Sequence, residues 1–520
     1  MIGSHRKIIY DEQVLNNPYE VIEIKNKEKI SLRKTKLNEK LLKIRKQNLA
    51  QSEIDLDINI KPEMKFKIKK LEDSYEQVIT YLNSNNKDLI KYSLNELNIF
   101  FMFNDLNVKE QIIIIEKQFF KILLKLGNIF IEDKNINDLF KLLYILINIQ
   151  VCEVGTKDYC KELYSKEFLE FYNKCMIVWN DDKEIFNLIR WIIYSLTEVN
   201  EYINLELLRS DVFLSIINYY KNQNIIENED KKLTLKLINY CLDISNLETL
   251  LNDDDITIIN KCLNQLASDI YSTNNVELLY LIYRGIYLIS NLDTDFNFNK
   301  RIIDEGVTLK ILKTKFNELK LNKFIIKIID FSLRIIANNL TATDKDCQVI
   351  YDQNIIDFYN NFLIKFDDYK IIRNILIGLS NIAVGSKRNV LLNSIIWEDK
   401  YIQKYCNILD EFKISYIKIV KYMIYNSDFT ILKFIFNTKI LDYFLYLITT
   451  NNISKIVCRK ILKLIDCYLK KFNKENKGTE EYLLIFHKFK DVMQSSDIIN
   501  DIDNINIITI ITENIKNNYN

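Results

Sequence analysis

A polar side chain recurs at nearly constant intervals through the chain, each time at the end of an apolar run. Seven occurrences follow one another at intervals of 43 to 51 residues: Asn148, Ser195, Asn246, Asn291, Asn338, Asn381 and Asn426. An asparagine amide both donates and accepts hydrogen bonds, so it can hold the backbone of an extended peptide. The residue four positions earlier shares its helix face. These partners, four of them Tyr or Trp, are Tyr144, Trp191, Leu242, Tyr287, Arg334, Ile377 and Tyr422.

Aromatic rings beside amides predict a particular ligand. A ring holds the aliphatic stem of Lys or Arg and attracts its charged head group, with each contact contributing about 0.5–2 kcal/mol. The sequence therefore predicts a receptor for extended basic peptides, on a wall that we expect to be net acidic. A single aromatic residue in a helix is more often an ordinary core residue. The shared register with the asparagines favours the receptor.

Composition limits the elements that can position these residues. The 520 residues include only 8 glycines and 2 prolines, with 48% hydrophobic and 27% charged residues. A β-rich or α/β protein of this length needs many more turn-forming residues. Phosphate-binding glycine loops of the types GxGxxG and GxxxxGK[ST] are absent. The apolar content excludes wholesale disorder. We therefore expect helices joined by turns of Asn, Asp and Ser.

From about Leu71 to Phe472, apolar residues recur at helical spacing with a polar break every dozen or so residues. A period in the low to middle forties is typical of armadillo and HEAT repeats. The predicted fold is all-α, an armadillo-repeat superhelical solenoid. We expect about ten repeats over residues 71–475, with the polar ladder on the concave face.

Several functional classes lack the residues that they need. We expect no signal peptide and no transmembrane helix, because no apolar stretch is long enough. Nine cysteines form no CxxC pair, and the two histidines are His5 and His487, so zinc clusters are implausible. Buried thiols in a reducing compartment are expected instead. With no catalytic signature, we predict that the protein is not an enzyme and has no cofactor.

A basic segment precedes the repeats. Its ten cations are opposed by only two carboxylates, which gives a net charge of +8 and leaves −7 for the rest: Lys25, Lys27, Lys29, Arg33, Lys34, Lys36, Lys40, Lys43, Arg45 and Lys46. Such an arm, here residues 1–60, binds an acidic surface, which could be the chain's own. The alternative is an amphipathic helix on nucleic acid or an anionic membrane.

Several segments resemble importin-alpha. KNKEKISLRKTKLNEKLLKIRKQN (25–48) resembles its importin-beta-binding helix, and NSNN (83–86) the opening of its first repeat. LRIIANNLTATDKDCQVI (333–350) and GLSNIAVGSKRNVLL (378–392) resemble its sixth and seventh repeats. Residues 476–520 resemble its acidic, exportin-binding tail. The resemblance spans nearly the whole chain.

The resemblance implies a nuclear import adaptor that shuttles between cytoplasm and nucleus. Its expected partners are importin-beta, cargo proteins with basic localisation signals, a recycling exportin and, indirectly, the nuclear pore, but neither nucleic acid nor a membrane interior. The implied major signal site is Tyr144, Asn148, Trp191, Ser195, Glu198 and Asn246. Tyr287 and Asn291 line the linker region. The implied minor site is Arg334, Asn338, Thr341, Asp344, Asn381, Tyr422 and Asn426.

The chain departs from the family pattern at several of these positions. Of the usual tryptophans only Trp191 is present, and Ser195 replaces one asparagine. Val199 stands where the family has an aspartate; either the adjacent Glu198 takes its role or the major site is degraded. We therefore expect signal binding to be weaker than in a full Trp/Asn array.

In the family the last basic cluster of the arm also binds the major groove and inhibits signal binding; here Ile44 interrupts that cluster. If the autoinhibition is kept, deleting residues 1–60 should raise the affinity for signal peptides. The alternative function is an armadillo-type cytoplasmic scaffold whose arm binds membrane or another partner.

Overall fold

The computed structural model describes residues 62–475 and His487, apart from 104–107, 117, 152–161, 198–200, 223–227, 293–296, 315, 317–320, 409, 426–428 and 450–452. The basic arm, and the acidic tail apart from His487, therefore lie outside the described residues. Within them every regular element is helical, and no helix is both long and apolar enough to cross a membrane. The chain divides into two compact units, residues 1–244 (unit 1) and 245–520 (unit 2).

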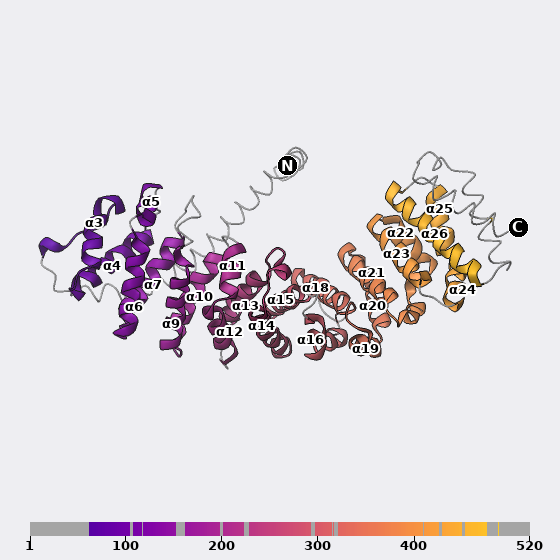
Figure 1. The fold of residues 1–520 in the computed structure, drawn as a ribbon, viewed down its shortest axis with the longest axis horizontal. Helices are drawn as coiled ribbons and strands as arrows, with labels where there is room; N and C mark the ends of the chain where they lie inside the picture. Colours follow the sequence, from indigo (N-terminus) through magenta and orange to yellow (C-terminus); the bar gives the residue numbers. More distant parts are fainter. Residues whose placement is uncertain are drawn as a thin grey trace. The chain divides into compact units, whose positions relative to one another are not determined.

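Unit 1 is built from short helices joined by tight turns (Figure 1). In chain order its described elements are η1 (Pro62–Met64), α3 (Leu71–Leu82), α4 (Lys87–Phe103), α5 (Val108–Glu116), α6 (Phe119–Glu132), α7 (Ile136–Val151), α9 (Lys166–Val178), α10 (Lys183–Thr197), α11 (Glu201–Leu208), α12 (Asp211–Asn222) and α13 (Asn228–Leu242). Helices α4, α7, α10 and α13 each pack on the next, and α6, α9 and α12 form a second such series. The two series pack together, α6 on α7 and α12 on α13.

Unit 2 repeats this arrangement. Its described elements are η2 (Leu247–Thr249), α14 (Asp253–Ser272), α15 (Val276–Ser290), α16 (Phe298–Asp304), α17 (Val307–Lys313), α18 (Lys323–Asn339), α19 (Asp344–Asp352), α20 (Ile355–Lys365), α21 (Tyr369–Val384), η4 (Arg388–Asn393), η5 (Ile395–Trp397), α22 (Asp399–Ile408), α23 (Asp410–Tyr425), α24 (Phe429–Asn437), α25 (Ile440–Thr449) and α26 (Lys455–Glu475). Helices α15, α18, α21, α23 and α26 pack each on the next. Helices α14, α20, α22 and α25 pack against α15, α21, α23 and α26 respectively.

Asparagine occupies many of the helix boundaries, both as an N-cap and at turns with positive φ. Asn252, Asn275 and Asn322 are N-caps whose side chains accept hydrogen bonds from the first turns of α14, α15 and α18. Asn297 and Asn354 adopt positive φ at turns, a conformation that Asn tolerates better than most residues. The prediction of turns built mainly on residues other than glycine is therefore confirmed in the described chain, although Gly306, with a positive φ, and Gly385 also stand at helix ends.

The core is a continuous layer of aliphatic and aromatic side chains within each unit. In α10, for example, Ile185, Ile189, Ile192 and Leu196 are buried, which is the predicted three-and-four spacing. Among the described cysteine side chains, five are buried and form no disulfide: Cys175, Cys241, Cys262, Cys347 and Cys458. These match the expectation of buried thiols, and burial raises the pKa of Cys262 to about 12.

Candidate functional site

The best-formed part of the polar ladder lies on three consecutive helices of unit 2. We call the surface formed by Tyr287 and Asn291 of α15, Arg334 and Asn338 of α18, and Ile377 and Asn381 of α21 the ladder face. Because α15 packs on α18 and α18 on α21, residues in the same register come side by side. Asn291 is exposed at the C-cap of α15, and the other two asparagines are half-buried.

Hydrogen bonds join the ladder asparagines across the helices. Asn338 Nδ2 donates to Ser290 Oγ and to Asn291 Oδ1, both at 2.9 Å. Asn381 Nδ2 donates to the backbone carbonyl of Ala337 at 2.7 Å. Each amide is thus oriented by the preceding helix. Neither the Oδ1 of Asn338 nor that of Asn381 accepts a hydrogen bond from a described residue. Both oxygens can therefore accept from a ligand.

The ring of Tyr287, the aromatic residue of the ladder face, is already covered by a cation of the same chain, Arg334. The guanidinium carbon of Arg334 lies 5.3 Å from the centroid of the Tyr287 ring, and its NH1 donates to the Tyr287 hydroxyl at 3.2 Å. Arg334 also forms an ion pair with Asp330 at 3.3 Å. Burial opposes the charge of Arg334, but the bonds to Tyr287 and Asp330 outweigh it and raise the pKa. The slot on Tyr287 is therefore filled internally.

Two further predicted minor-site residues surround the end of α18. Thr341 is exposed, and its hydroxyl donates to the backbone carbonyl of Asn338 at 2.6 Å. Asp344, in the first turn of α19, is exposed and accepts from the backbone N–H of Ser386 at 3.2 Å. Tyr422 is half-buried on α23, the next helix of the series. Asn426 lies outside the described residues.

In unit 1 the corresponding amide points into the protein. Asn148 is only 2% exposed and donates to Asn98 Oδ1 on α4 at 3.3 Å. Tyr144, one turn earlier on α7, is half-buried and donates from its hydroxyl to Glu184 Oε1 of α10 at 3.0 Å. The exposed group beside Tyr144 is thus the carboxylate of Glu184, whereas Asn148 is buried between helices.

The next rung of unit 1 is aromatic. Trp191 is half-buried and contacts Tyr194 edge-on, at a centroid distance of 5.8 Å. Tyr194 in turn contacts Tyr240 of α13, and the Lys236 ammonium lies 5.4 Å from the Tyr194 centroid. The Ser195 hydroxyl donates to the carbonyl oxygens of Trp191 and Ile192 in its own helix, as short hydroxyl side chains in helices do. Glu198 lies outside the described residues.

The third predicted rung is not helical. α13 ends at Leu242, which is 2% exposed, so this side chain belongs to the core. Asn246 follows in a turn, exposed and with a positive φ of 56°. The expectation that Asn246 lies late in a helix, one turn beyond Leu242, is therefore wrong. A cluster of turn-forming residues, Asp243, Ser245 and Asn246, interrupts the helix before the ladder position.

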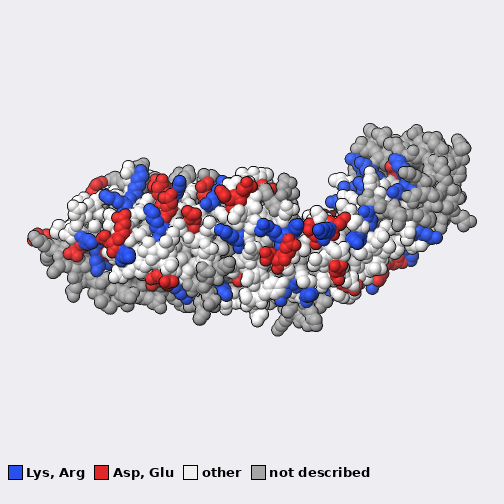
Figure 2. All heavy atoms as spheres, turned by 60° about the horizontal axis from the view of Figure 1, so that its bottom comes forward, with Lys and Arg blue, Asp and Glu red and all other residues white. Residues whose placement is uncertain are grey.

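Charge also departs from expectation. The body as a whole is net acidic, but the helices that carry the ladder of unit 2 are not: α15 has one Glu and one Arg, and basic residues outnumber acidic ones in α18, α21 and α23, as they do in the next helix of the series, α26. In Figure 2, blue and red alternate over unit 1, whereas blue predominates over the described surface toward the C-terminal end. The expected net-acidic wall is therefore wrong for these helices, because a summed charge does not say which face carries it.

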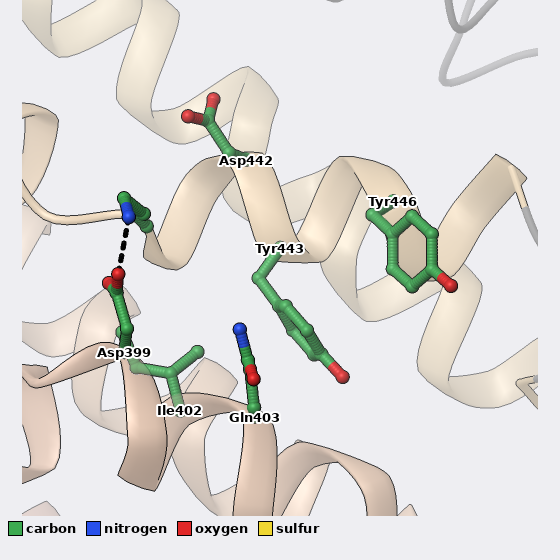
Figure 3. A pocket seen from close by; sticks show the side chains of 7 residues that line it. Asp399, Ile402, Gln403, Asp442, Tyr443 and Tyr446 are labelled. Carbon is green, nitrogen blue, oxygen red and sulfur yellow. Dashed lines mark hydrogen bonds and ion pairs between the residues drawn. The ribbon is translucent and has the colours of Figure 1, made fainter.

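A small cavity of about 180 Å³ opens between α22 and α25 (Figure 3). Asp399 and Lys439 form an ion pair at its edge, and Tyr443 and Tyr446 extend along one side. Ligand pockets for small organic molecules usually exceed about 300 Å³. None of the predicted site residues lines this cavity, and its size argues against a small-molecule site.

Sequence reasoning missed several residues that shape these rungs. Glu184 lies seven positions before Trp191, two helical turns away on the same face, and this spacing could have revealed it. Asn98 lies 50 residues before Asn148 and begins the ladder one repeat earlier. Phe331 stacks on Tyr287 with a centroid distance of 5.2 Å. The Arg334–Asp330 ion pair was also missed, although Asp330 lies four positions before Arg334 on the same helix, the spacing at which Asp and Arg pair.

Comparison with known proteins bears on the fold. No family model and no curated protein matches this chain. An engineered protein of known structure shares 13% identity, covers 86% of this chain and 98% of its own, and has a TM-score of 0.61. A chain from a study of the interaction between cadherin and beta-catenin shares 9% identity over 86% of this chain and 84% of its own (TM-score 0.54). A computationally designed armadillo repeat protein for modular peptide recognition matches 49% of this chain and 99% of its own, with 12% identity and a TM-score of 0.39.

At these identities the likeness concerns the fold alone. The series of helices packed each on the next and the match to solved structures agree with the sequence prediction of the fold: the chain folds as an all-α armadillo-type solenoid. Armadillo repeats form binding scaffolds in which each repeat contacts chiefly its neighbours.

Proposed function

We propose that this protein is a peptide-binding adaptor of the nuclear import type. In this proposal its ladder residues bind extended segments of cargo proteins, and its basic arm, residues 1–60, binds importin-beta. The observation that carries the peptide-binding part is the row of amides on the ladder face, in which Asn338 and Asn381 are each fixed by a hydrogen bond to the preceding helix. The adaptor role adds the resemblance of the arm, whose charge is +8 between Lys25 and Lys46.

The spacing of the ladder suits an extended backbone. Packed helices lie about 8–10 Å apart, and an extended chain advances about 3.3 Å per residue, so neighbouring rungs fit backbone groups about three residues apart. Asn338 and Asn381 would accept from ligand N–H groups through Oδ1. The Nδ2 of Asn291, which donates to no described residue, would donate to a ligand carbonyl. Binding through the backbone makes few demands on ligand sequence.

Basic side chains of the ligand fit unit 1 better than the ladder face. The exposed carboxylate of Glu184 and the half-buried ring of Trp191 lie on one side of α10, and together they offer a charge and a stacking surface. On α18 the equivalent place is filled by Arg334. We therefore assign recognition of a Lys or Arg side chain to Trp191 and Glu184, and recognition of backbone to the ladder face.

The remaining partners follow from the resemblance alone. The arm would link the cargo complex to importin-beta, and residues 476–520 would bind the exportin that returns the adaptor to the cytoplasm. The protein would accordingly shuttle between cytoplasm and nucleus. Both segments lie outside the described residues.

Removal of one ladder amide tests the peptide-binding part. Asn338→Ala in the full chain should weaken binding of a fluorescein-labelled, lysine-rich localisation-signal peptide about five- to tenfold, because a hydrogen bond contributes about 1 kcal/mol. Fluorescence anisotropy gives the Kd. Asn361→Ala, at an exposed position of α20, is the matched control and should leave the Kd unchanged. Equal affinities for the two variants would remove the ladder face from the proposal.

The second candidate, an armadillo scaffold with another partner, is favoured by the basic character of α18, α21, α23 and α26. The binding partner of the basic arm distinguishes the import adaptor from the scaffold. The import adaptor should bind importin-beta in solution and lose that binding when Lys40, Lys43 and Lys46 are replaced by Glu. Binding of the full chain to anionic liposomes but not to importin-beta would support the scaffold instead.

A further inference from the structure

Five lysines from two neighbouring helices of unit 2 share one surface, which we call the basic strip. They are Lys418 and Lys421 on α23 and Lys463, Lys470 and Lys471 on α26. Lys421 lies three residues after Lys418, and Lys470 and Lys471 lie seven and eight residues after Lys463, about two helical turns, so each set lies on one side of its helix. Helix α23 packs directly on α26.

The two sets of lysines meet where α23 packs on α26. The half-buried thiol of Cys467 on α26 lies near Lys421 of α23 and near Lys470 and Lys471 of its own helix, and their positive charges oppose the rise in its pKa that burial causes. The strip therefore continues across the junction between the helices.

Most of the charge on the strip is uncompensated within the described chain. Lys418, Lys421 and Lys463 are exposed and form no ion pair with a described residue. Lys470 is paired with Asp466 at 2.7 Å. On the preceding helices Arg334 is paired with Asp330 and Arg373 with Glu411, whereas Lys327 of α18 and Lys370 of α21 form no ion pair with a described residue. Among the described residues, lysines without an ion pair are more numerous on α23 and α26 than on α18 and α21.

Aromatic surface accompanies this charge. Tyr422 is half-buried, and Tyr425 is 66% exposed, one turn beyond Lys421 on α23. Such exposure of a large ring beside unpaired cations is typical of an interaction surface, where Tyr supplies contact area and a polar hydroxyl.

We propose that the basic strip docks an extended acidic segment of a partner protein. The strip continues the register of the ladder face, because Tyr422 follows Arg334 and Ile377 at the repeat interval and α21 packs on α23. An extended segment crossing helices about 8–10 Å apart, at about 3.3 Å per residue, presents carboxylates to successive helices when they are three residues apart. The preferred ligand therefore has Asp or Glu at every third position.

The layout of the strip, rather than its residue type, favours an acidic peptide over a nucleic-acid backbone. Lysine ammonium groups pair with carboxylates and with phosphates alike. The charges lie along one row, at intervals that suit the carboxylates of a single extended peptide. This inference does not rest on the proposed import function, since it needs neither the basic arm nor a basic cargo.

The test uses the full chain and a fluorescein-labelled peptide of four Asp-Ser-Ala triplets. Its Kd is measured by fluorescence anisotropy at low salt, together with that of a peptide of the same composition in which the four aspartates are adjacent. We expect the spaced peptide to bind at least threefold more tightly. Lys421→Glu combined with Lys463→Glu should weaken its binding at least tenfold.

Matched controls separate the strip from net charge. Lys261→Glu combined with Lys345→Glu makes the same charge change at exposed positions of α14 and α19 and should change the Kd less than twofold. Asn338→Ala, which tests the ladder face, should leave the acidic peptide bound. Carbodiimide crosslinking of the unmodified chain with the peptide, read by mass spectrometry, should join its aspartates to Lys421, Lys463 or Lys470, and this measurement does not depend on any variant folding.

Three results would overturn the proposal. Equal effects of the two double variants would show a general charge effect. Tighter binding of a single-stranded 12-nucleotide DNA than of the peptide would assign the strip to nucleic acid. The chain's own residues 491–513 contain five acidic and no basic residues; crosslinks from these to the strip, with no binding of added peptide, would make the occupant internal.

Discussion

At the scale of single residues, Gly378 of α21 packs against Tyr359 of α20 with no room for a side chain. A Cβ atom at position 378 would come 2.1 Å from the Tyr359 hydroxyl oxygen, and both residues are buried. Gly378→Ala should therefore destabilise the protein by about 1–3 kcal/mol through overpacking, although alanine's helix propensity recovers up to about 1 kcal/mol. The midpoint of urea denaturation measures the change.

A second substitution checks this cause. Tyr359→Phe removes the hydroxyl oxygen that meets the new methyl group, and that hydroxyl has no hydrogen-bond partner among the described residues. In the Gly378→Ala background, Tyr359→Phe should recover part of the lost stability. A double variant no more stable than Gly378→Ala would contradict the packing explanation.

The Arg334 rung gives a functional prediction at the same scale. Arg334→Ala removes the cation that covers the Tyr287 ring and leaves Asp330 without its arginine partner. A lysine side chain of a ligand could then occupy the ring, which is worth about 0.5–2 kcal/mol. We expect a lysine-rich peptide to bind about three- to tenfold more tightly by anisotropy. Arg301→Ala, on α16, is the control; weaker binding by Arg334→Ala would mean that Arg334 itself contacts the ligand.

At the scale of elements, helix starts depend on asparagine caps. Asn322 is typical: its Oδ1 accepts from the backbone N–H groups of Phe324 and Ile325, at 2.9 and 3.0 Å. Asn322→Ala should cost about 1 kcal/mol, and Asn322→Asp should restore most of it because aspartate caps equally well. Hydrogen exchange at the first turn of α18 localises the effect. Equal protection in Asn322→Ala and the unmodified chain would show that packing alone holds this end.

At the scale of the whole molecule, unfolding should follow the two units. Stacked repeats contact mainly their neighbours in sequence, so their stability is roughly a sum of local terms. Trp179 and Trp191 report on unit 1 and Trp397 on unit 2. With Trp397 as the single tryptophan, after Trp179→Phe and Trp191→Phe, Gly378→Ala should shift the urea midpoint of fluorescence. With Trp397→Phe, the remaining tryptophans should report an unchanged midpoint; an equal shift in both would indicate one cooperative transition.

Much of this architecture was predictable because it rests on local rules. Three-and-four spacing of Ile and Leu placed helices such as α10 and α18, and the shortage of glycine predicted turns built on residues such as Asn297. The repeat interval placed Asn291, Asn338 and Asn381 in one register, and the packing of α15, α18 and α21 brings them together.

Other features depended on neighbours that are distant in the sequence. Asn148 and Asn338 look alike in the sequence, yet Asn148 is buried against Asn98 while Asn338 lies half-exposed beside Asn291. Asn246 lies outside a helix because turn-forming residues precede it and α13 ends at Leu242. The import role, its partners and the functions of the arm and tail remain predictions.

By itself, the sequence determined an all-α chain with a forty-residue period, since the spacing of apolar residues and the choice of capping residues act within a few turns of helix. Only the tertiary structure decided which amides face outward, that Arg334 fills the ring of Tyr287, and that unpaired lysines gather on α23 and α26. The physical reason is that exposure, ion pairing and local potential are properties of faces, and a face is assembled from residues 40 to 50 positions apart only when the helices pack.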